Sequence, residues 1–231
     1  NMVVLDEADE MLDMGFQEDL ETLLGAAAAR TRTLMFSATL PSNILSMAAR
    51  YQKDAVRVDV RPENRNAAHD DIEYVAHLTA VGAHLPAVIN VLRSNGNGRT
   101  IVFGTTREGV SALHGELVRR GFSAVVLSGD RAQHERNRAL AALRSGEAHV
   151  LVATNVAARG LDLPEVDLVV HADLPLNTED LTHRSGRTGR AGRKGRSVVI
   201  ANLAERRKAE RLMRNAGVKF TWTEVPSADA I

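Results

Sequence analysis

The chain has 231 residues, of which 44% are hydrophobic, so it is long enough to bury a substantial core in one or two domains. It contains no cysteine, which excludes disulfides and thiolate zinc sites, and its apolar runs fall short of the roughly 18 residues of a membrane span. With no recognisable signal peptide either, the expected location is the cytoplasm. The 29 Lys and Arg residues balance 29 Asp and Glu residues, but this zero net charge combines an acidic start with a basic segment near the end.

Short β-branched runs alternate with helical patterns along the whole chain. Strands are predicted at residues 3–5, 33–36, 72–78, 100–103, 124–127, 150–153, 168–171 and 197–201, with an edge strand at 220–225. Helices are predicted at residues 19–29, 43–51, 84–94, 109–120, 135–144 and 204–216. This alternation predicts an α/β fold in which right-handed crossovers build mainly parallel sheets with helices on both faces.

A polar stretch with a proline, residues 60–70, is predicted to link two domains. Residues 71–225 have the size of a complete α/β domain, and residues 226–231 form a tail. Residues 1–59 supply only two strands and two helices, which would leave sheet edges with unpaired backbone groups and only half a core. We therefore expect this part to be the C-terminal half of a first domain whose N-terminal half is missing.

Polar residues follow five of the predicted strands at the point where each strand ends. They are Asp6-Glu7-Ala8-Asp9, Ser37-Ala38-Thr39, Thr105-Thr106, Ser128-Gly129-Asp130 and Thr154-Asn155. Capping of a strand end explains any one of them by itself. Because ligands of doubly wound sheets bind beyond the carboxyl ends of the strands, five such groups favour a binding site at that edge.

An aspartate that ends a hydrophobic strand is typical of a Walker B site, which holds Mg²⁺ on the β and γ phosphates of a nucleotide. Asp6 fits this arrangement, and Glu7 is placed to orient or deprotonate an attacking water. The alternative interpretation makes both carboxylates part of the first turn of an acidic helix, stabilised by the helix dipole.

The segment 183–196 holds six Arg or Lys residues, one histidine and four glycines. If residues 181–188 form a helix, His183, Arg184 and Arg187 lie within one turn of one another and can converge on a phosphate. A solvated basic loop is the alternative interpretation.

Taken together, these residues resemble the later motifs of the DEAD-box RNA helicases of superfamily 2, from motif II through motif VI. The matching segments are Asp6 to Asp9, Ser37 to Thr39, residues 153–162 and residues 183–190, with Ile101-Val102-Phe103 and Thr106 similar to motif IV, and Gln133 with Arg136 similar to the pair that precedes motif V. The resemblance runs from residue 3 to about residue 199. It implies two RecA-like units, one partial and one complete, that use ATP and Mg²⁺.

The resemblance also implies a role for each matching residue. Asp6 would hold Mg²⁺ and Glu7 would act on the hydrolytic water, while Asp9, Ser37, Thr39 and His183 would couple hydrolysis to domain closure. Arg187 and Arg190 would be arginine fingers at the γ-phosphate, and Gly160 and Asp162 would lie at the nucleotide. RNA would be bound mostly through phosphates and 2′-hydroxyls, without sequence preference, by Thr106, Gly129, Gln133, Arg136, Thr154 and Arg159.

The sequence departs from the family pattern in two respects. Asn155 stands where family members usually have aspartate, so one charge interaction is lost or replaced by a neutral hydrogen bond. No G-x-x-x-x-G-K-[ST] phosphate loop occurs in the chain, so we expect this fragment alone to be inactive.

The expected function is that of an ATP-dependent RNA helicase that locally unwinds or remodels RNA duplexes, with RNA as partner and no membrane. A non-enzymatic RNA-binding or annealing module is the alternative, because the chain lacks a phosphate loop, and a DNA-directed member of the wider superfamily is a third candidate. Tyr74 and Trp222 are expected to pack in the core rather than stack on bases, because only 3% of the residues are aromatic.

Overall fold

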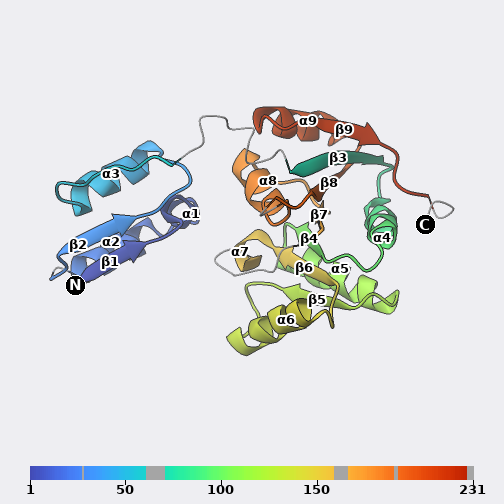
Figure 1. The fold of residues 1–231 in the computed structure, drawn as a ribbon, viewed down its shortest axis with the longest axis horizontal. Helices are drawn as coiled ribbons and strands as arrows, with labels where there is room; N and C mark the ends of the chain where they lie inside the picture. The colour runs from blue at the N-terminus through green and yellow to red at the C-terminus, as the bar shows by residue number, and fades with distance from the viewer. Residues whose placement is uncertain (28, 61–70, 159–165, 190–191, 228–231) are drawn as a thin grey trace. The chain divides into compact units, whose positions relative to one another are not determined.

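The computed structural model describes residues 1–27, 29–60, 71–158, 166–189 and 192–227. The chain divides into two compact units, Asn1–Val60 and Arg61–Ile231, which are described separately (Figure 1). The expected linker falls on residues 61–70, and most of the expected tail on residues 228–231, so both lie outside the described residues.

The first unit has a two-stranded parallel sheet and three helices. Strand β1 (Met2–Leu5) pairs with β2 (Arg32–Met35), with Leu5 opposite Met35. The helices are α1 (Ala8–Asp13), α2 (Gln17–Ala26) and α3 (Ser42–Tyr51). Leu5 of β1, Leu24 of α2 and Ile44 of α3 lie in a common core, so both helices pack on the face of the sheet that carries Leu5. Helix α1 was not predicted, because its six residues are too short to show a helical period.

The second unit is built on a seven-stranded sheet in the order β5-β6-β4-β7-β8-β3-β9, in which every neighbouring pair is parallel. Its strands are β3 (Ile72–Thr79), β4 (Thr100–Gly104), β5 (Ala124–Leu127), β6 (Val150–Thr154), β7 (Leu168–His171), β8 (Gly195–Asn202) and β9 (Phe220–Thr223). Its helices are α4 (His84–Ser94), α5 (Arg107–Arg119), α6 (Gln133–Ser145), α7 (Asn155–Ala158), α8 (Thr178–Ser185) and α9 (Arg206–Asn215). The predicted parallel α/β sheet is confirmed.

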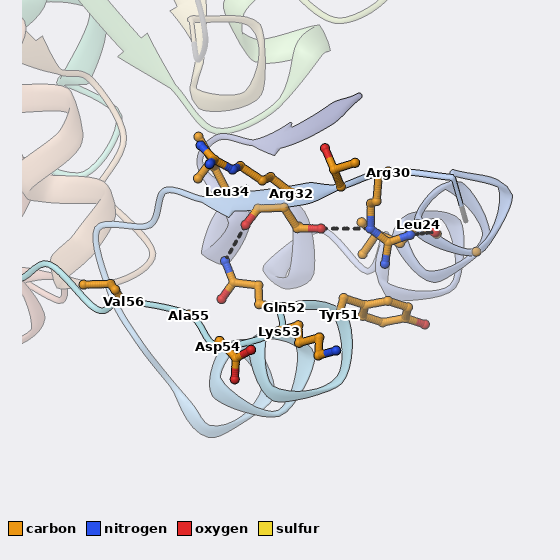
Figure 2. Close-up of a pocket in the computed structure, with 13 residues that line it drawn as sticks. Leu24, Arg30, Arg32, Leu34, Tyr51, Gln52, Lys53, Asp54, Ala55 and Val56 are labelled. Atoms are coloured by element: carbon orange, nitrogen blue, oxygen red, sulfur yellow. Dashed lines mark hydrogen bonds between the residues drawn. The ribbon is translucent and has the colours of Figure 1, made fainter.

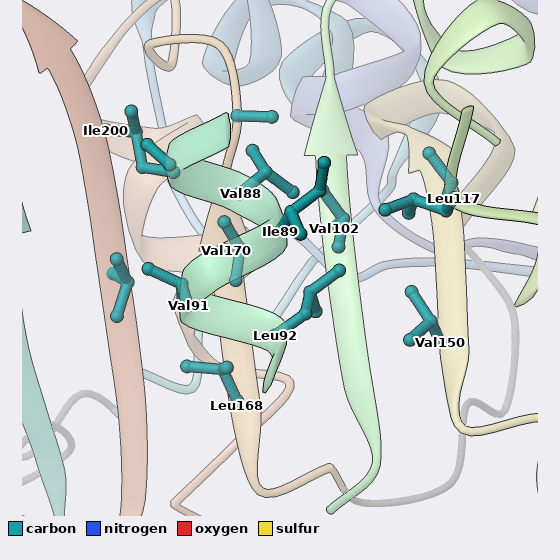
Figure 3. Close-up of a cluster of buried hydrophobic side chains, with 14 of the residues drawn as sticks. Val88, Ile89, Val91, Leu92, Val102, Leu117, Val150, Leu168, Val170 and Ile200 are labelled. Carbon is teal, nitrogen blue, oxygen red and sulfur yellow. The ribbon is translucent and has the colours of Figure 1, made fainter. Parts of the chain in front are cut away.

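Helices cover both faces of this sheet, as alternate residues of β4 reveal. Val102 points to a cluster that includes Val88 and Leu92 of α4, where the close-up in Figure 3 shows α4 lying over the strands. Ile101 belongs to a different cluster, with Leu143 of α6. Because successive side chains of a strand point to opposite faces, α4 and α6 must cover opposite sides of the sheet.

Helix α8 begins and ends earlier than the prediction of residues 181–188. Its first turn is capped by the Asn177 side chain, which accepts a hydrogen bond from the Asp180 amide at 2.8 Å. The helix stops at Ser185 and Gly186 follows it, so Arg187 lies in a turn. Tyr74 is 4% exposed, and half-buried Trp222 packs against the same cluster, which confirms that both serve the core.

Candidate functional site

In the first unit, Asp6 and Glu7 are exposed where β1 ends. The Glu7 amide donates to Asp6 Oδ1 at 3.0 Å, and the Glu7 backbone is left-handed, with φ 52° and ψ 43°. A left-handed residue that is not glycine costs about 1–2 kcal/mol. The chain therefore holds Glu7 in a strained turn between β1 and helix α1.

Asp9 is 6% exposed and ties α1 to the loop after β2. One oxygen, Oδ2, accepts hydrogen bonds from the Thr39 amide and the Thr39 hydroxyl, each at 2.7 Å. The Asp9 amide donates to the Ser37 hydroxyl at 3.3 Å, and that hydroxyl donates to the Thr39 carbonyl at 2.6 Å. Asp9, Ser37 and Thr39 thus form one network, as the resemblance implied for this part of the coupling set.

The charge state of Asp9 follows from two opposing effects. Burial alone would raise the pKa of its carboxyl group, but the hydrogen bonds from Thr39, Ser37 and Glu10 outweigh burial and lower the pKa below its ordinary 3.8. Asp9 Oδ1 is buried without a hydrogen-bond partner among the described residues. The carboxylate is therefore ionised at neutral pH and keeps one oxygen free to accept a further donor.

The donor set at Asp6 fits Mg²⁺ bound with a nucleotide. The described residues contain no group of three His, Cys, Asp or Glu side chains that could hold a metal by themselves. Mg²⁺ usually keeps several waters and is held by one or two carboxylates together with substrate phosphates. One exposed aspartate is thus a sufficient protein ligand for such an ion, provided that a nucleotide supplies phosphate oxygens.

A hollow of about 830 Å³ in the first unit is unrelated to these motifs (Figure 2). It is lined at the start of β2, whereas Ser37 and Thr39 follow the end of that strand. Two of its polar side chains are engaged within the chain, since Gln52 donates to the Thr33 carbonyl at 3.0 Å and Arg30 to the Thr33 hydroxyl at 2.8 Å. The volume of this hollow therefore does not identify it as the functional site of the first unit.

In the second unit, the polar motifs gather at one edge of the sheet. Gly104, the last residue of β4, lies opposite Thr154, the last residue of β6. The Thr105 amide donates to Asp173 Oδ2 at 2.8 Å, which joins the end of β4 to the loop after β7. Thr106 caps helix α5 by accepting from the Gly109 amide at 3.0 Å, and its side chain is exposed.

The other predicted RNA-binding residues surround helices α6 and α7. Gly129 and Gln133 are exposed, whereas Arg136 is half-buried and donates from Nη2 to the Ala157 carbonyl at 3.1 Å. Thr154 is 6% exposed and accepts from the Ala157 amide at 3.4 Å. Arg136 and Thr154 therefore both support α7, the short helix missed by the sequence prediction because it has a single turn.

Arg184 was expected to face a ligand from its helix, but its side chain is buried, with 3% of the residue exposed. Its Nε donates to Asn155 Oδ1, its Nη1 donates to the Asp173 carbonyl at 3.1 Å, and its guanidinium lies 5.4 Å from the centroid of the Phe103 ring. Arg184 nevertheless borders one small hollow together with His183 and Arg187, so the convergence of the three on one phosphate stays a prediction. Of the two outcomes expected for Asn155, a lost interaction or a hydrogen bond, the structure has the hydrogen bond, and its donor is the charged guanidinium of Arg184.

Arg187 lies half-buried in the turn after α8, which two glycines hold against the sheet. Gly189 has φ 65°, and a Cβ atom there would come within 2.5 Å of Ile72 Cγ1. A Cβ atom on Gly195 would come within 2.0 Å of the Thr188 hydroxyl, which donates to the Val166 carbonyl. The glycines of this basic segment thus bring the chain close to β3 and β8.

A buried network that the sequence analysis missed anchors the end of α8. Nε2 of His171 lies 3.0 Å from the Ser197 hydroxyl and 3.3 Å from the Ser185 hydroxyl, and the two hydroxyls are 2.9 Å apart. His171 is fully buried, and burial together with the Arg184 charge lowers its pKa well below the ordinary value. The neutral ring therefore links β7, β8 and the helix that carries His183.

His183 is half-buried and, with Arg187 and Asn155, borders a small hollow beside Phe103. Four predicted site residues, Arg159, Gly160, Asp162 and Arg190, lie outside the described residues. The second unit thus brings His183 and Arg187 together at the strand ends. The RNA-binding candidates lie along the neighbouring part of the same edge.

Comparisons with known proteins match both units. A family model described as DEAD/DEAH box helicase matches residues 1–47, and one described as helicase conserved C-terminal domain matches residues 83–192. DEAD-box ATP-dependent RNA helicase 9 of Oryza sativa subsp. japonica is 41% identical over 221 residues, which are 95% of this chain and 35% of that protein. The chloroplastic DEAD-box ATP-dependent RNA helicase 3B of Zea mays is 38% identical over 232 residues, which are 99% of this chain and 31% of that protein.

A solved structure of S. cerevisiae Dbp5 bound to RNA and ADP BeF3 has a TM-score of 0.83 and 27% identity, and the match covers 99% of this chain and 61% of that one. The chain spans about a third of the length of the two curated relatives. The expected cytoplasmic location is contradicted by the maize relative, which is chloroplastic. Among the described residues, no helix is both long and apolar enough to cross a membrane.

The match of a DEAD-box model to the first unit and of a helicase C-terminal model to the second agrees with the order of motifs along the chain. Parallel sheets flanked by helices, together with the likeness to Dbp5, identify the fold as RecA-like. The chain belongs to the DEAD-box family of RNA helicases.

Proposed function

We propose that this chain acts in an ATP-dependent RNA helicase that couples ATP binding and hydrolysis to the local unwinding or remodelling of RNA duplexes. The observation that carries the proposal is the division of the Asp6 to Asp9 motif. Asp6 and Glu7 are exposed at the end of β1, whereas Asp9 is buried and bound to Thr39. The motif therefore has two exposed carboxylates that a ligand can reach, and a third that is hydrogen-bonded to the loop after β2.

In the first unit, Asp6 would hold Mg²⁺ together with the nucleotide phosphates, and a bound ion would supply positive charge next to the transferred group. Glu7 orients or deprotonates the attacking water, and its strained backbone supports such a role, because strain of this kind clusters at functional sites. A movement of α1 during hydrolysis is transmitted to the loop after β2 through the hydrogen bonds among Asp9, Ser37 and Thr39. His183 is the coupling residue of the second unit. The hydrogen bonds of Asp9 support this assignment.

In the second unit, Arg187 and Arg190 stabilise the negative charge that develops on the transferred phosphoryl group, and Gly160 and Asp162 lie at the nucleotide. RNA is held through its phosphates and 2′-hydroxyls by Thr106, Gly129, Gln133, Arg136, Thr154 and Arg159. The exposure of Thr106, Gly129 and Gln133 supports direct contact. Arg136 and Thr154 act partly through α7, which they hold in place.

The chain by itself contains no phosphate loop, so nothing in it cradles the α and β phosphates. We propose that turnover requires such a segment. We define the extended protein as this chain preceded by the phosphate-loop half of a DEAD-box first domain. The 231-residue chain should hydrolyse no ATP above background, and the extended protein should hydrolyse it when RNA is added.

The second candidate is a non-enzymatic RNA-binding or annealing module, which the lack of a phosphate loop favours. One experiment separates the candidates: ATP hydrolysis by the extended protein, measured with RNA and DNA oligonucleotides of the same sequence, with Glu7→Gln as the inactive control. The proposal predicts stimulation by RNA and little by DNA. Annealing without hydrolysis would favour the module, and equal stimulation by DNA would favour a DNA-directed enzyme.

A further inference from the structure

Helix α9 carries a row of exposed cations that none of the roles above uses. Residues 205–219 contain six Arg or Lys residues and only two carboxylates. The inner side of the helix is apolar, since Ala209 and Met213 are buried in the core of the second unit. The outer side presents Arg207, Lys208, Arg211 and Arg214 to solvent.

Three of these residues form a straight stripe, which we call the α9 stripe: Arg207, Arg211 and Arg214. Their spacing of four and three residues places them on one face, and the stripe is about 10 Å long at a rise of 1.5 Å per residue. Among the described residues, no ion pair or hydrogen bond engages the side chains of the stripe. In contrast, neighbouring Arg206 pairs with Glu210 at 3.2 Å and lies 5.4 Å from the Trp222 ring.

Of the stripe residues, only Arg214 stabilises the helix, because it lies in the last turn, where the dipole favours a cation. Like charges three or four residues apart on a helix repel one another. Cations also oppose the dipole when they lie in the first turn, where α9 has Arg206, Arg207 and Lys208 and no acidic residue. A solvated helix face would be more stable with mixed charges, so a polyanion that neutralises the stripe accounts for it better than folding does.

The α9 stripe is separate from the RNA-binding candidates at the strand ends. Those residues lie around β4, β5, β6 and α6, whereas α9 packs over β8 and β3 (Figure 1). The nearest of these strands, β4 and β8, are two positions apart, or about 10 Å at the usual strand spacing, and β5, beside α6, is five positions or about 24 Å from β3. A phosphate held at α6 is therefore not the phosphate that reaches α9.

We propose that the α9 stripe is a second RNA-binding surface, and that it holds the phosphate backbone of double-stranded RNA. This inference rests on RNA being the partner proposed above. A rigid row of charges on a convex helix matches the regular row of phosphates along one strand of a duplex. Single strands are bound mainly in grooves with aromatic stacking platforms, whereas Phe220 and Trp222 beside α9 pack into the core.

The test compares two variants of the 231-residue chain that lose the same charge. The stripe variant is Arg207→Gln, Arg211→Gln and Arg214→Gln, which keeps good helix formers in α9. The control variant is Arg32→Gln, Lys53→Gln and Arg93→Gln, three exposed cations outside both RNA surfaces. Circular dichroism checks that both variants are folded, and a blunt RNA duplex and an unstructured single strand of equal length serve as probes.

The stripe variant should bind the duplex on the order of tenfold more weakly, and the slope of log K against log salt should fall by about 2.7, at roughly 0.9 for each of three phosphates. Its affinity for the single strand, and both affinities of the control variant, should stay within about twofold. Equal duplex losses in the two variants, unchanged duplex binding by the stripe variant, or an equal loss of single-strand affinity would overturn the inference.

The proposed RNA partner is tested separately in the same assay. Arg136→Gln should weaken binding of the single strand, because it acts at the strand-end surface. If the unchanged chain binds neither probe, the proposed function fails and the inference fails with it. If it binds the single strand but the stripe variant retains full duplex affinity, only the inference fails, and an acidic protein becomes the better occupant of the stripe.

Discussion

At the scale of single residues, Glu7 shows how this chain places a functional group at the expense of stability. Its backbone is left-handed, a conformation that glycine adopts freely and glutamate does not. Folding alone would favour glycine at this position. The strained position of Glu7 supports the action on water that we propose for its carboxylate.

We expect Glu7→Gly to separate stability from activity in the extended protein. The change removes a strain of about 1–2 kcal/mol but loosens the unfolded chain, so the free energy of unfolding should stay equal or rise by up to about 1 kcal/mol. RNA-stimulated hydrolysis should be lost in both Glu7→Gly and Glu7→Gln. Denaturant unfolding and turnover measure the two effects, and a Glu7→Gly protein with substantial turnover would contradict the role of the carboxylate.

Thr39 should control the ionisation of Asp9. Because the folded pKa of Asp9 lies below its ordinary 3.8, the ionised carboxylate stabilises the first unit above that pH, and the contribution is lost as the pH falls through the folded pKa. Thr39→Val removes the hydroxyl donor at 2.7 Å and keeps the amide donor, so the pKa of Asp9 should rise and the loss should begin at higher pH. A carbon NMR titration of the carboxyl group measures this shift. An unchanged pKa would show that the hydroxyl bond is unimportant.

At the scale of elements, the turn from Gly186 to Gly189 is positioned by its neighbours more than by its own sequence. Helix α8 is fixed at its end by the contact of Ser185 with His171 and Ser197. The turn that follows is pressed onto β8 at Gly195. Arg187 is therefore positioned by packing of its helix and turn on two strands, β7 and β8.

Gly195→Ala should displace this turn. The added methyl group would lie 2.0 Å from the Thr188 hydroxyl and 2.5 Å from the Gly189 amide nitrogen, so the turn or the strand must move. We expect a loss of about 1–3 kcal/mol in the free energy of unfolding and lower turnover in the extended protein. Gly115→Ala in α5 is the matched control, since its methyl group would be no closer than 3.6 Å to Arg119. Equal turnover and equal free energies of unfolding in the two variants would contradict the idea that the close contact at Gly195 positions Arg187.

The sequence predicts the strands and the longer helices because their apolar periods are local properties. It misses α1 and α7, which have six and four residues and no room for a period. It places α8 too late because the basic pattern continues past Gly186, where the helix ends. The burial of Arg184 and the network around His171 could not be predicted, because their partners are distant in sequence and meet only in the folded sheet.

At the scale of the whole molecule, the two units carry different parts of one proposed reaction. In this proposal, the first unit supplies an aspartate for the metal and a glutamate for the water, and the second supplies arginines and the edge that binds RNA. Each unit has a hydrophobic core of its own. We propose that Arg187 of the second unit acts on the phosphates of a nucleotide, rather than belonging to a basic RNA-binding loop.

The most direct test measures saturated turnover and RNA affinity for four variants of the extended protein: Arg187→Ala, Arg190→Ala, Arg193→Ala and Lys194→Ala. An arginine that acts on charge developing in the transition state should cost on the order of 10³-fold in turnover, with a far smaller effect on ATP binding. We predict this loss for Arg187→Ala and Arg190→Ala, and small effects for changes at the exposed Arg193 and Lys194. Similar losses of RNA affinity at all four positions, with normal turnover, would contradict the account.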